Sequence, residues 1–88
     1  MAYRIIIQAS AQREMRALPD QVFTRLDKRI QALSTTPRPP KVERLETGHP
    51  VYRFRVGDYR ILYEIRDADR LVIITAVRHR REAYRRIP

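Results

Sequence analysis

The chain has 88 residues, which is enough for one domain and too few for two. It contains no cysteine, so neither a disulfide nor a thiolate metal site can stabilise it. Its 19 Lys and Arg residues outnumber 10 Asp and Glu residues, and the resulting net charge of +9 favours a polyanionic partner such as a nucleic acid. The apolar run from Ile5 to Ile7 is too short for a signal peptide or a membrane span, so a cytoplasmic protein is expected.

The N-terminal segment predicts a strand that leads into a short helix. Tyr3 to Gln8 is rich in β-branched residues, which is typical of a strand. Ser10 is a candidate N-cap, because its hydroxyl can accept a hydrogen bond from a free N–H in the first helical turn. Pro19 disfavours helical geometry at the residue before it, so we expect this helix to end at Leu18.

A second, longer helix is expected to begin after Asp20, another candidate N-cap. Its apolar residues recur at helical spacing and form one stripe, namely Phe23, Leu26, Ile30 and Leu33. The segment from Thr35 to Pro40 contains three prolines, which favour an extended linker. Residues 42–50 are ambiguous, and Gly48 with Pro50 indicates a turn.

Three strands are predicted in the second half of the chain. They span Val51–Val56, Tyr59–Arg66 and Leu71–Val77, and the turns between them are short. Two helices grouped before such an antiparallel meander predict an α+β fold, in which the helices cover one face of a curved sheet. Residues 1–88 then form a single domain.

Alternation along these strands predicts one apolar face and one arginine-bearing face. Arg53 and Arg55 share a face of the first predicted strand, opposite its apolar residues. Burying unpaired guanidinium groups is prohibitive, so both arginines are expected to point away from the helices. In the next strand Arg60 joins this open face together with Leu62 and Glu64. The residues of that strand expected in the core are Tyr59, Ile61, Tyr63 and Ile65.

The candidate functional residues combine these arginines with the C-terminal segment. The candidate catalytic residues are Arg53, Arg55, Arg60, His79, Arg80 and Tyr84, and the candidate RNA-binding residues are Arg78, Arg81 and Tyr52. Strands lie about 4.8 Å apart, so arginines of neighbouring strands can converge on one phosphate. A guanidinium can stabilise charge on phosphorus but stays protonated and makes a poor base. Histidine exchanges a proton near neutral pH, so His79 is the candidate for proton transfer.

Purely structural explanations compete with this hypothesis. Alternating arginines in an edge strand can form a charged face that blocks edge-to-edge pairing. Arg53 or Arg55 can also pair with Glu64 across the hairpin, a contact worth about 0.2–1 kcal/mol. The cations between Arg78 and Arg86 can simply be a solvated helix end.

Two stretches of the sequence resemble a known family. Residues 51–64 read Val-Tyr-Arg-Phe-Arg-Val-Gly-Asp-Tyr-Arg-Ile-Leu-Tyr-Glu, and residues 77–84 read Val-Arg-His-Arg-Arg-Glu-Ala-Tyr. Together they resemble the RelE branch of the RelE/ParE toxin superfamily, and the predicted elements of nearly the whole chain fit it. The resemblance implies an endoribonuclease toxin of a type II toxin–antitoxin system. Such a toxin cleaves mRNA in the ribosomal A site, inhibits translation and has a fold similar to small microbial ribonucleases.

The resemblance also implies roles for individual residues. Arg53 and Arg55 fall where well-studied members carry a pair of lysines that accept a proton and contact phosphate. Arg60 matches an arginine that stabilises the charged phosphorane. Arg80 matches an arginine assigned to protonation of the leaving group or to phosphate binding, and Tyr84 matches a tyrosine that stacks on or orients the substrate. Because arginine is a poorer base than lysine, His79 is then the candidate to take over proton transfer. Side-chain alternation puts His79 and Arg80 on opposite faces unless the strand ends or bulges first, so only one of the two is expected to point into the site.

The implied partners are a cognate antitoxin protein, mRNA in the ribosomal A site and ribosomal RNA, with no membrane, metal or other cofactor. Attack by the 2′-oxygen would leave a 2′,3′-cyclic phosphate. One alternative is a ParE-type toxin that inhibits DNA gyrase on the same fold. The other is an inactive member that binds an antitoxin or RNA without cleaving it.

Overall fold

The computed structural model of the chain describes residues 2–45 and 50–79. Its elements are, in order, β1 (Arg4–Ile7), α1 (Ala9–Arg16), α2 (Asp20–Ala32), β2 (Glu43–Leu45), β3 (Val51–Val56), β4 (Tyr59–Arg66) and β5 (Leu71–His79). The predicted α+β class is confirmed. Two features go beyond the prediction: the ambiguous segment contributes the short strand β2, and β5 continues past Val77 to His79.

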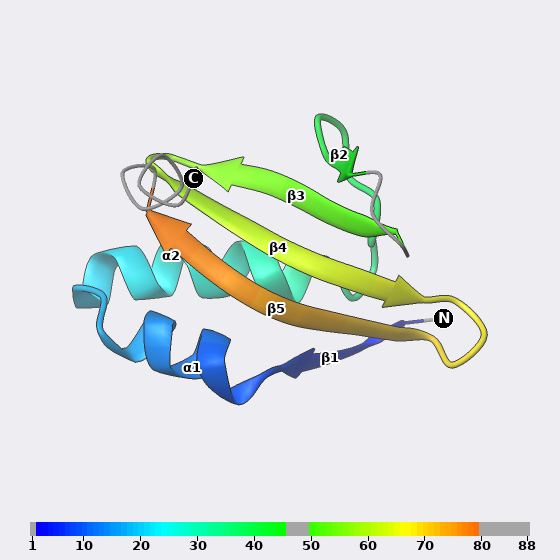
Figure 1. Cartoon of the computed structure of the whole chain (residues 1–88), viewed down its shortest axis with the longest axis horizontal. Coiled ribbons are helices and arrows are strands. Elements are labelled where there is room, and N and C mark those ends of the chain that lie inside the picture. Colours follow the sequence, from blue (N-terminus) through cyan, green and yellow to red (C-terminus); the bar gives the residue numbers. More distant parts are fainter. Residues whose placement is uncertain (1, 46–49, 80–88) are drawn as a thin grey trace, which may run out of the picture.

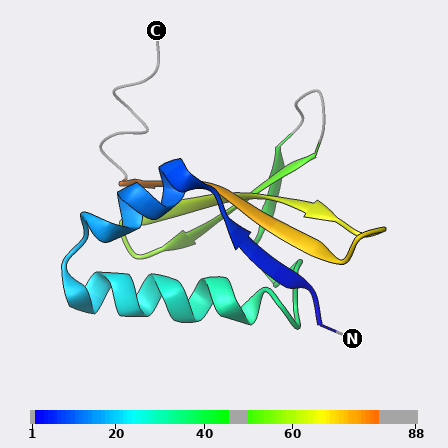
Figure 2. The same cartoon turned by 90° about the horizontal axis from the view of Figure 1, so that it is seen from below.

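The described strands form one five-stranded sheet in the order β1-β5-β4-β3-β2 (Figure 1). β1 runs parallel to β5, and the other neighbours are antiparallel. The helix α2 lies across one face of the sheet, as the turned view shows (Figure 2). The helix α1 lies beside β5 where the strand continues beyond the end of β1 (Figure 1). The opposite face of the sheet is left open by both helices, as the alternation of side chains predicted.

The core lies between the sheet and the helices. The buried apolar residues of the described part are Ala11, Met15, Leu26, Ile30, Leu33, Tyr52, Phe54, Val56, Ile61, Tyr63, Val72, Ile74 and Val77. At its centre the ring of Tyr63 stacks on Tyr52 and meets Phe54 edge to face, both at 5.7 Å between ring centroids. The buried aromatic residues of β3 and β4 therefore lie on the face of the sheet that the helix side covers.

Both helices begin differently from the prediction. The residues at the N-cap positions are Gln8 for α1 and Pro19 for α2, and neither forms a side-chain capping bond. Ser10 lies inside α1, and Asp20 is the first residue of α2, where its carboxylate complements the positive end of the helix dipole. The Leu18 N–H donates to the Met15 carbonyl in a tighter turn, so α1 ends before Leu18.

The proline-rich segment from Thr35 to Pro40 has neither helix nor strand, as predicted. It is held against the sheet by side chains. The buried Tyr63 hydroxyl donates to the Pro37 carbonyl at 2.8 Å, and Arg38 donates to both carboxylate oxygens of Asp67 at 3.2 and 2.8 Å. The segment thus connects α2 to β2 along a defined path. Neither described helix is long and apolar enough to cross a membrane.

Candidate nucleic-acid interface

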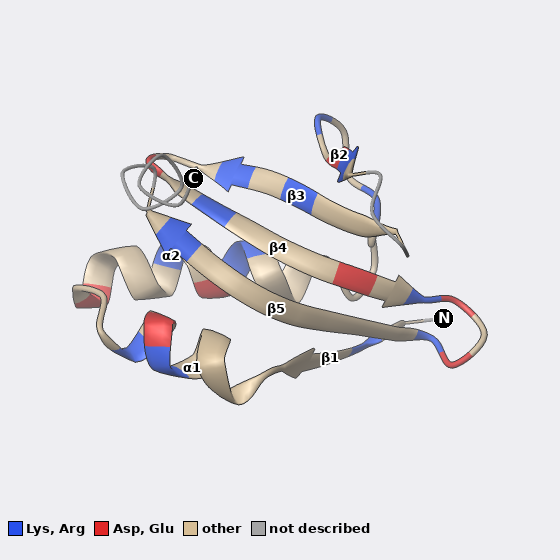
Figure 3. Ribbon diagram, viewed as in Figure 1, with Lys and Arg blue, Asp and Glu red and all other residues tan. Residues whose placement is uncertain are grey.

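Three arginines stand side by side on the open face of the sheet. In the strand register Arg55 of β3 is opposite Arg60 of β4, and Arg60 is opposite Arg78 of β5. Figure 3 shows the basic segments of the three strands next to one another near the end of β5. Directly opposed residues share a face and lie about 4.5–5.5 Å apart at Cβ, so we call these three residues the arginine row.

The register confirms the predicted division between the two faces of β3 and β4. Phe54 and Ile61 are opposed and buried, whereas the neighbouring pair Arg55 and Arg60 lies on the other face. β4 is flanked by β3 and β5 throughout the arginine row. Protection of an exposed sheet edge therefore does not explain Arg60, because Arg60 does not lie at an edge.

A β-bulge in β5 decides which C-terminal residue joins this row. Leu62 is opposite Ala76 and Tyr63 is opposite Ile74, which leaves Thr75 as an extra residue. Its hydroxyl donates to the Leu62 carbonyl at 3.2 Å. Since side chains alternate along a strand, one extra residue exchanges the faces of all the residues after it. Arg78 consequently lies on the open face.

The same bulge places His79 on the helix side of the sheet. His79 is opposite Tyr59, and the two rings meet edge to face at 5.0 Å between centroids. The strand neighbour Val77 is buried, which confirms the orientation of this part of β5. The structure therefore places His79 on the face opposite Arg55 and Arg60, so of the pair His79 and Arg80 it is not His79 that points toward these arginines. Arg80, Arg81 and Tyr84 lie outside the described residues.

Tyr52 is also separated from the open face, although it was a candidate for RNA binding. It is 7% exposed and belongs to the core. Its hydroxyl accepts a hydrogen bond from Arg38 Nε at 3.2 Å, and the Arg38 guanidinium lies 5.4 Å from its ring centroid. Tyr52 therefore packs on the covered face of β3 and does not share the open face with the arginines.

Arg53 lies on the open face beside the arginine row and pairs with Glu43 rather than with Glu64. The two residues are opposed between β2 and β3, and their side chains approach to 2.6 Å. The hydrogen bond from Arg53 lowers the pKa of Glu43, and the charges of Arg55 and Arg60 lower it further. The charges of three arginines thus act on the one carboxylate of Glu43.

Glu14 of α1 holds the other end of the arginine row. Its carboxylate accepts the Val77 backbone N–H at 2.9 Å and forms an ion pair with Arg78. Sequence reasoning missed both Glu14 and Glu43. Glu14 is 63 residues from Val77 along the chain and carries no local motif, so no sequence signal links the two.

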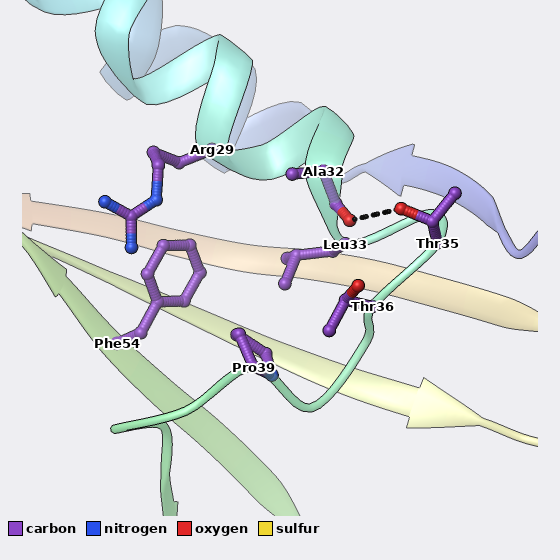
Figure 4. A pocket seen from close by; sticks show the side chains of 7 residues that line it. All are labelled: Arg29, Ala32, Leu33, Thr35, Thr36, Pro39 and Phe54. Carbon is purple, nitrogen blue, oxygen red and sulfur yellow. Dashed lines mark hydrogen bonds between the residues drawn. The ribbon is translucent and has the colours of Figure 1, made fainter.

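A cavity of about 260 Å³ lies on the helix side of the sheet (Figure 4). Arg29 of α2 and Phe54 of β3 line it side by side, with the guanidinium carbon 5.7 Å from the ring centroid, and Pro39 borders it from the proline-rich segment. It therefore lies behind the arginine-bearing face. Among the described residues no three His, Asp or Glu side chains gather as metal ligands.

Comparisons with known proteins agree with this architecture. The family model described as ParE toxin of type II toxin–antitoxin system, parDE, matches residues 5–84. A Methanocaldococcus jannaschii protein named "Putative toxin RelE1" is 28% identical over 88 residues, which is 97% of this chain and 98% of that protein.

Solved structures show the same arrangement of elements. A chain of the archaeal RelE–RelB complex from Pyrococcus horikoshii OT3 superposes with a TM-score of 0.82 and 30% identity, over 91% of this chain and 97% of that chain. A chain of the RelBE2 toxin–antitoxin complex from Mycobacterium tuberculosis superposes with a TM-score of 0.80 and 27% identity, over 91% of this chain and 93% of that chain. The sequence motifs, the sheet with its helices and these matches all agree. The chain therefore belongs to the ParE toxin family of type II toxin–antitoxin systems, within the RelE/ParE superfamily.

Proposed function

We propose that this toxin is an endoribonuclease that cleaves mRNA on translating ribosomes and so inhibits translation. The observation that carries the proposal is the in-register arginine row of Arg55, Arg60 and Arg78. Opposed like charges destabilise a sheet by roughly 0.2–1 kcal/mol per pair. A phosphate bound on the open face would offset this repulsion, because its oxygens carry the opposite charge.

The row suits the transition state of RNA cleavage. Attack of a 2′-oxygen on the adjacent phosphorus places extra negative charge on the phosphate oxygens, and then the bond to the 5′-oxygen breaks. Guanidinium groups held in advance near those oxygens stabilise the charge without reorganising. The products are a 2′,3′-cyclic phosphate and a 5′-hydroxyl, with no metal required.

The remaining proton transfers are assigned outside the row. Arginine stays protonated, so in this proposal solvent water takes the proton of the 2′-hydroxyl and returns one to the departing 5′-oxygen. In this proposal Arg53 contributes to phosphate binding, Arg80 to the leaving oxygen, and Arg81 and Tyr84 to RNA contacts, as the family resemblance implies. The solved relatives are RelE–RelB and RelBE2 toxin–antitoxin complexes, which supports a cognate antitoxin as the protein partner of this chain.

The test is primer extension on mRNA from translating ribosomes, with wild type beside Arg60→Ala. Removing one group that stabilises transition-state charge typically costs 10²–10³ in rate, so we expect cutting by Arg60→Ala to fall by at least about 100-fold. Arg66→Ala is the matched control, because Arg66 is on the same strand and face at the opposite end of β4. Its cutting should stay within about threefold of wild type.

A second measurement separates binding from cleavage. Binding to an RNA with a 2′-deoxy linkage, which cannot be cleaved, should weaken by about 0.7 log units per log unit of salt for each phosphate contact. Arg60→Ala should lower that slope and Arg66→Ala should not. Equal cutting by all three proteins would contradict the proposal, and RNA binding without a cyclic phosphate product would identify an inactive binding member.

The second candidate function is inhibition of DNA gyrase, which the match to the ParE toxin model favours. On this reading, expression raises DNA-damage signalling while transcripts stay intact. Arg60→Ala distinguishes the two activities, because the gyrase reading does not require the arginine row. Damage signalling that is unchanged in Arg60→Ala, with no cut transcripts in wild type, would replace the nuclease by the gyrase inhibitor.

A further inference from the structure

Glu14 makes two contacts with consecutive residues of β5. One carboxylate oxygen accepts the Val77 N–H, and the other pairs with the Arg78 guanidinium. Both charged side chains are about three-quarters covered, with 26% exposure for Glu14 and 24% for Arg78. An ion pair in such a position is screened less by solvent than one on an open surface.

The pairing of the strands explains why the Val77 N–H donates to a side chain of α1. β1 pairs with β5 only as far as Ile74, so no strand within residues 2–45 and 50–79 lies along the outer edge of β5 at Val77. A half-buried N–H without an acceptor costs stability, and Glu14 supplies the acceptor from α1. The helix α1 thereby supplies the hydrogen-bond acceptor for β5 at the point where the arginine row ends.

The charge contact acts on the row itself. Arg78 is opposite Arg60, and their like charges repel. A carboxylate at the outer end offsets part of this repulsion, and its second contact fixes the strand that presents the guanidinium. Glu43 occupies the corresponding place beside Arg53 at the β2 side of the sheet.

We propose that Glu14 is a positioning residue for the arginine row: it holds Arg78 beside Arg60 in the geometry that receives phosphate. The inference rests on the proposed nuclease function and deepens it. Glu14 itself does not contact RNA. Preorganised groups contribute most to catalysis when neighbouring residues restrict their motion, so loss of this contact should lower the rate of the chemical step more than it lowers RNA affinity.

The discriminating variant is Glu14→Gln, which keeps an oxygen for the Val77 N–H and removes the charge. Asp69→Asn is the matched control, since it makes the same charge change in the exposed turn at the other end of β5. Single-turnover cleavage on programmed ribosomes gives a saturating rate and a half-saturating toxin concentration for each protein.

We expect Glu14→Gln to lower the saturating rate about tenfold, because a misplaced contact group typically costs at least this much. Its half-saturating concentration should be unchanged or lower, since the variant is more positive. Asp69→Asn should keep the wild-type rate. If the Glu14 carboxylate only stabilises the fold, Glu14→Gln should have a lower melting temperature but an unchanged cleavage rate per folded molecule. That result would overturn the proposal.

Two further measurements test the route through Arg78. In an Arg78→Ala background Glu14→Gln should have no additional effect on the rate, whereas two independent losses that multiply would overturn the proposal. If wild type cleaves no RNA, the nuclease function fails but the positioning role is still tested by nitrogen NMR of the Arg78 guanidinium. Rotation of this group should be slower in wild type than in Glu14→Gln, and equal rotation would overturn the inference.

Discussion

At the residue scale, the composition of the site depends on one inserted residue. Strict alternation from the buried Ile74 would place Arg78 on the helix side and His79 on the open face. The extra residue Thr75 reverses this outcome. The structure therefore places Arg78, a candidate RNA-binding residue, on the open face beside Arg60, and His79 on the helix side, where its ring packs against Tyr59.

Substitution of Arg78 and of His79 tests whether the bulge exchanges the positions of these two side chains. Arg78→Ala should lower RNA cleavage by about 100-fold, because it removes one charge from the transition-state site. His79→Ala should lower it by no more than about threefold per folded molecule and should mainly cost stability through the lost ring contact. Cleavage rates and melting temperatures measured together decide the matter. A larger loss of cleavage in His79→Ala would restore His79 as the proton-transfer residue.

At the element scale, the β3–β4 hairpin determines the pairing of Arg55 with Arg60. Its turn begins at Gly57, which has a φ of +60°, a value that other residues adopt only with strain. A first turn residue with positive φ is typical of two-residue hairpin loops, whose twist matches that of the strands. A methyl group at Gly57 would also lie 2.9 Å from Arg25 Nη2, the mobile end of a long side chain.

Gly57→Ala should therefore destabilise the protein by about 1–2 kcal/mol, chiefly from the left-handed backbone conformation, since the Arg25 side chain can move. Urea denaturation measures the change. Asp58→Ala is the control from the same exposed turn and should stay within about 0.5 kcal/mol of wild type. Equal midpoints for Gly57→Ala and wild type would show that the turn tolerates a different geometry.

At the scale of the whole molecule, Asp67 connects three distant parts of the chain. It accepts hydrogen bonds from Tyr3 at the start of the chain and from Arg38 in the proline-rich segment, while it lies in the β4–β5 turn itself. These hydrogen bonds, first that of Arg38 and then that of Tyr3, lower the pKa of Asp67. The network holds the far end of the sheet together, away from the arginine row.

This network predicts a specific loss of stability in acid. A carboxyl whose pKa is lowered by folding stabilises the protein above its unfolded pKa of about 3.9 and loses that contribution as the pH falls through the folded value. Wild type should therefore unfold at higher urea than Asp67→Asn at pH 7, and the difference should shrink below about pH 4. Asp69→Asn from the same turn should follow wild type at every pH. A difference between wild type and Asp67→Asn that persists undiminished at pH 3 would rule out this linkage.

Local sequence determined much of this protein. The alternation of arginine with apolar residues from Tyr52 to Arg60 and the short turns were sufficient to predict the open face and the pairing of β3 with β4, because period-two burial and tight turns depend on neighbouring residues.

Contacts between distant residues decided the rest. The short strand β2 forms by pairing with β3, the bulge at Thr75 depends on the register between β4 and β5, and Glu14 reaches Arg78 only after α1 has packed beside β5. None of these contacts has a periodic or local signal, since each is determined by packing and pairing between separate segments of the chain. The sequence by itself therefore determined that arginines face outward, and the tertiary structure decided which of them stand in one row.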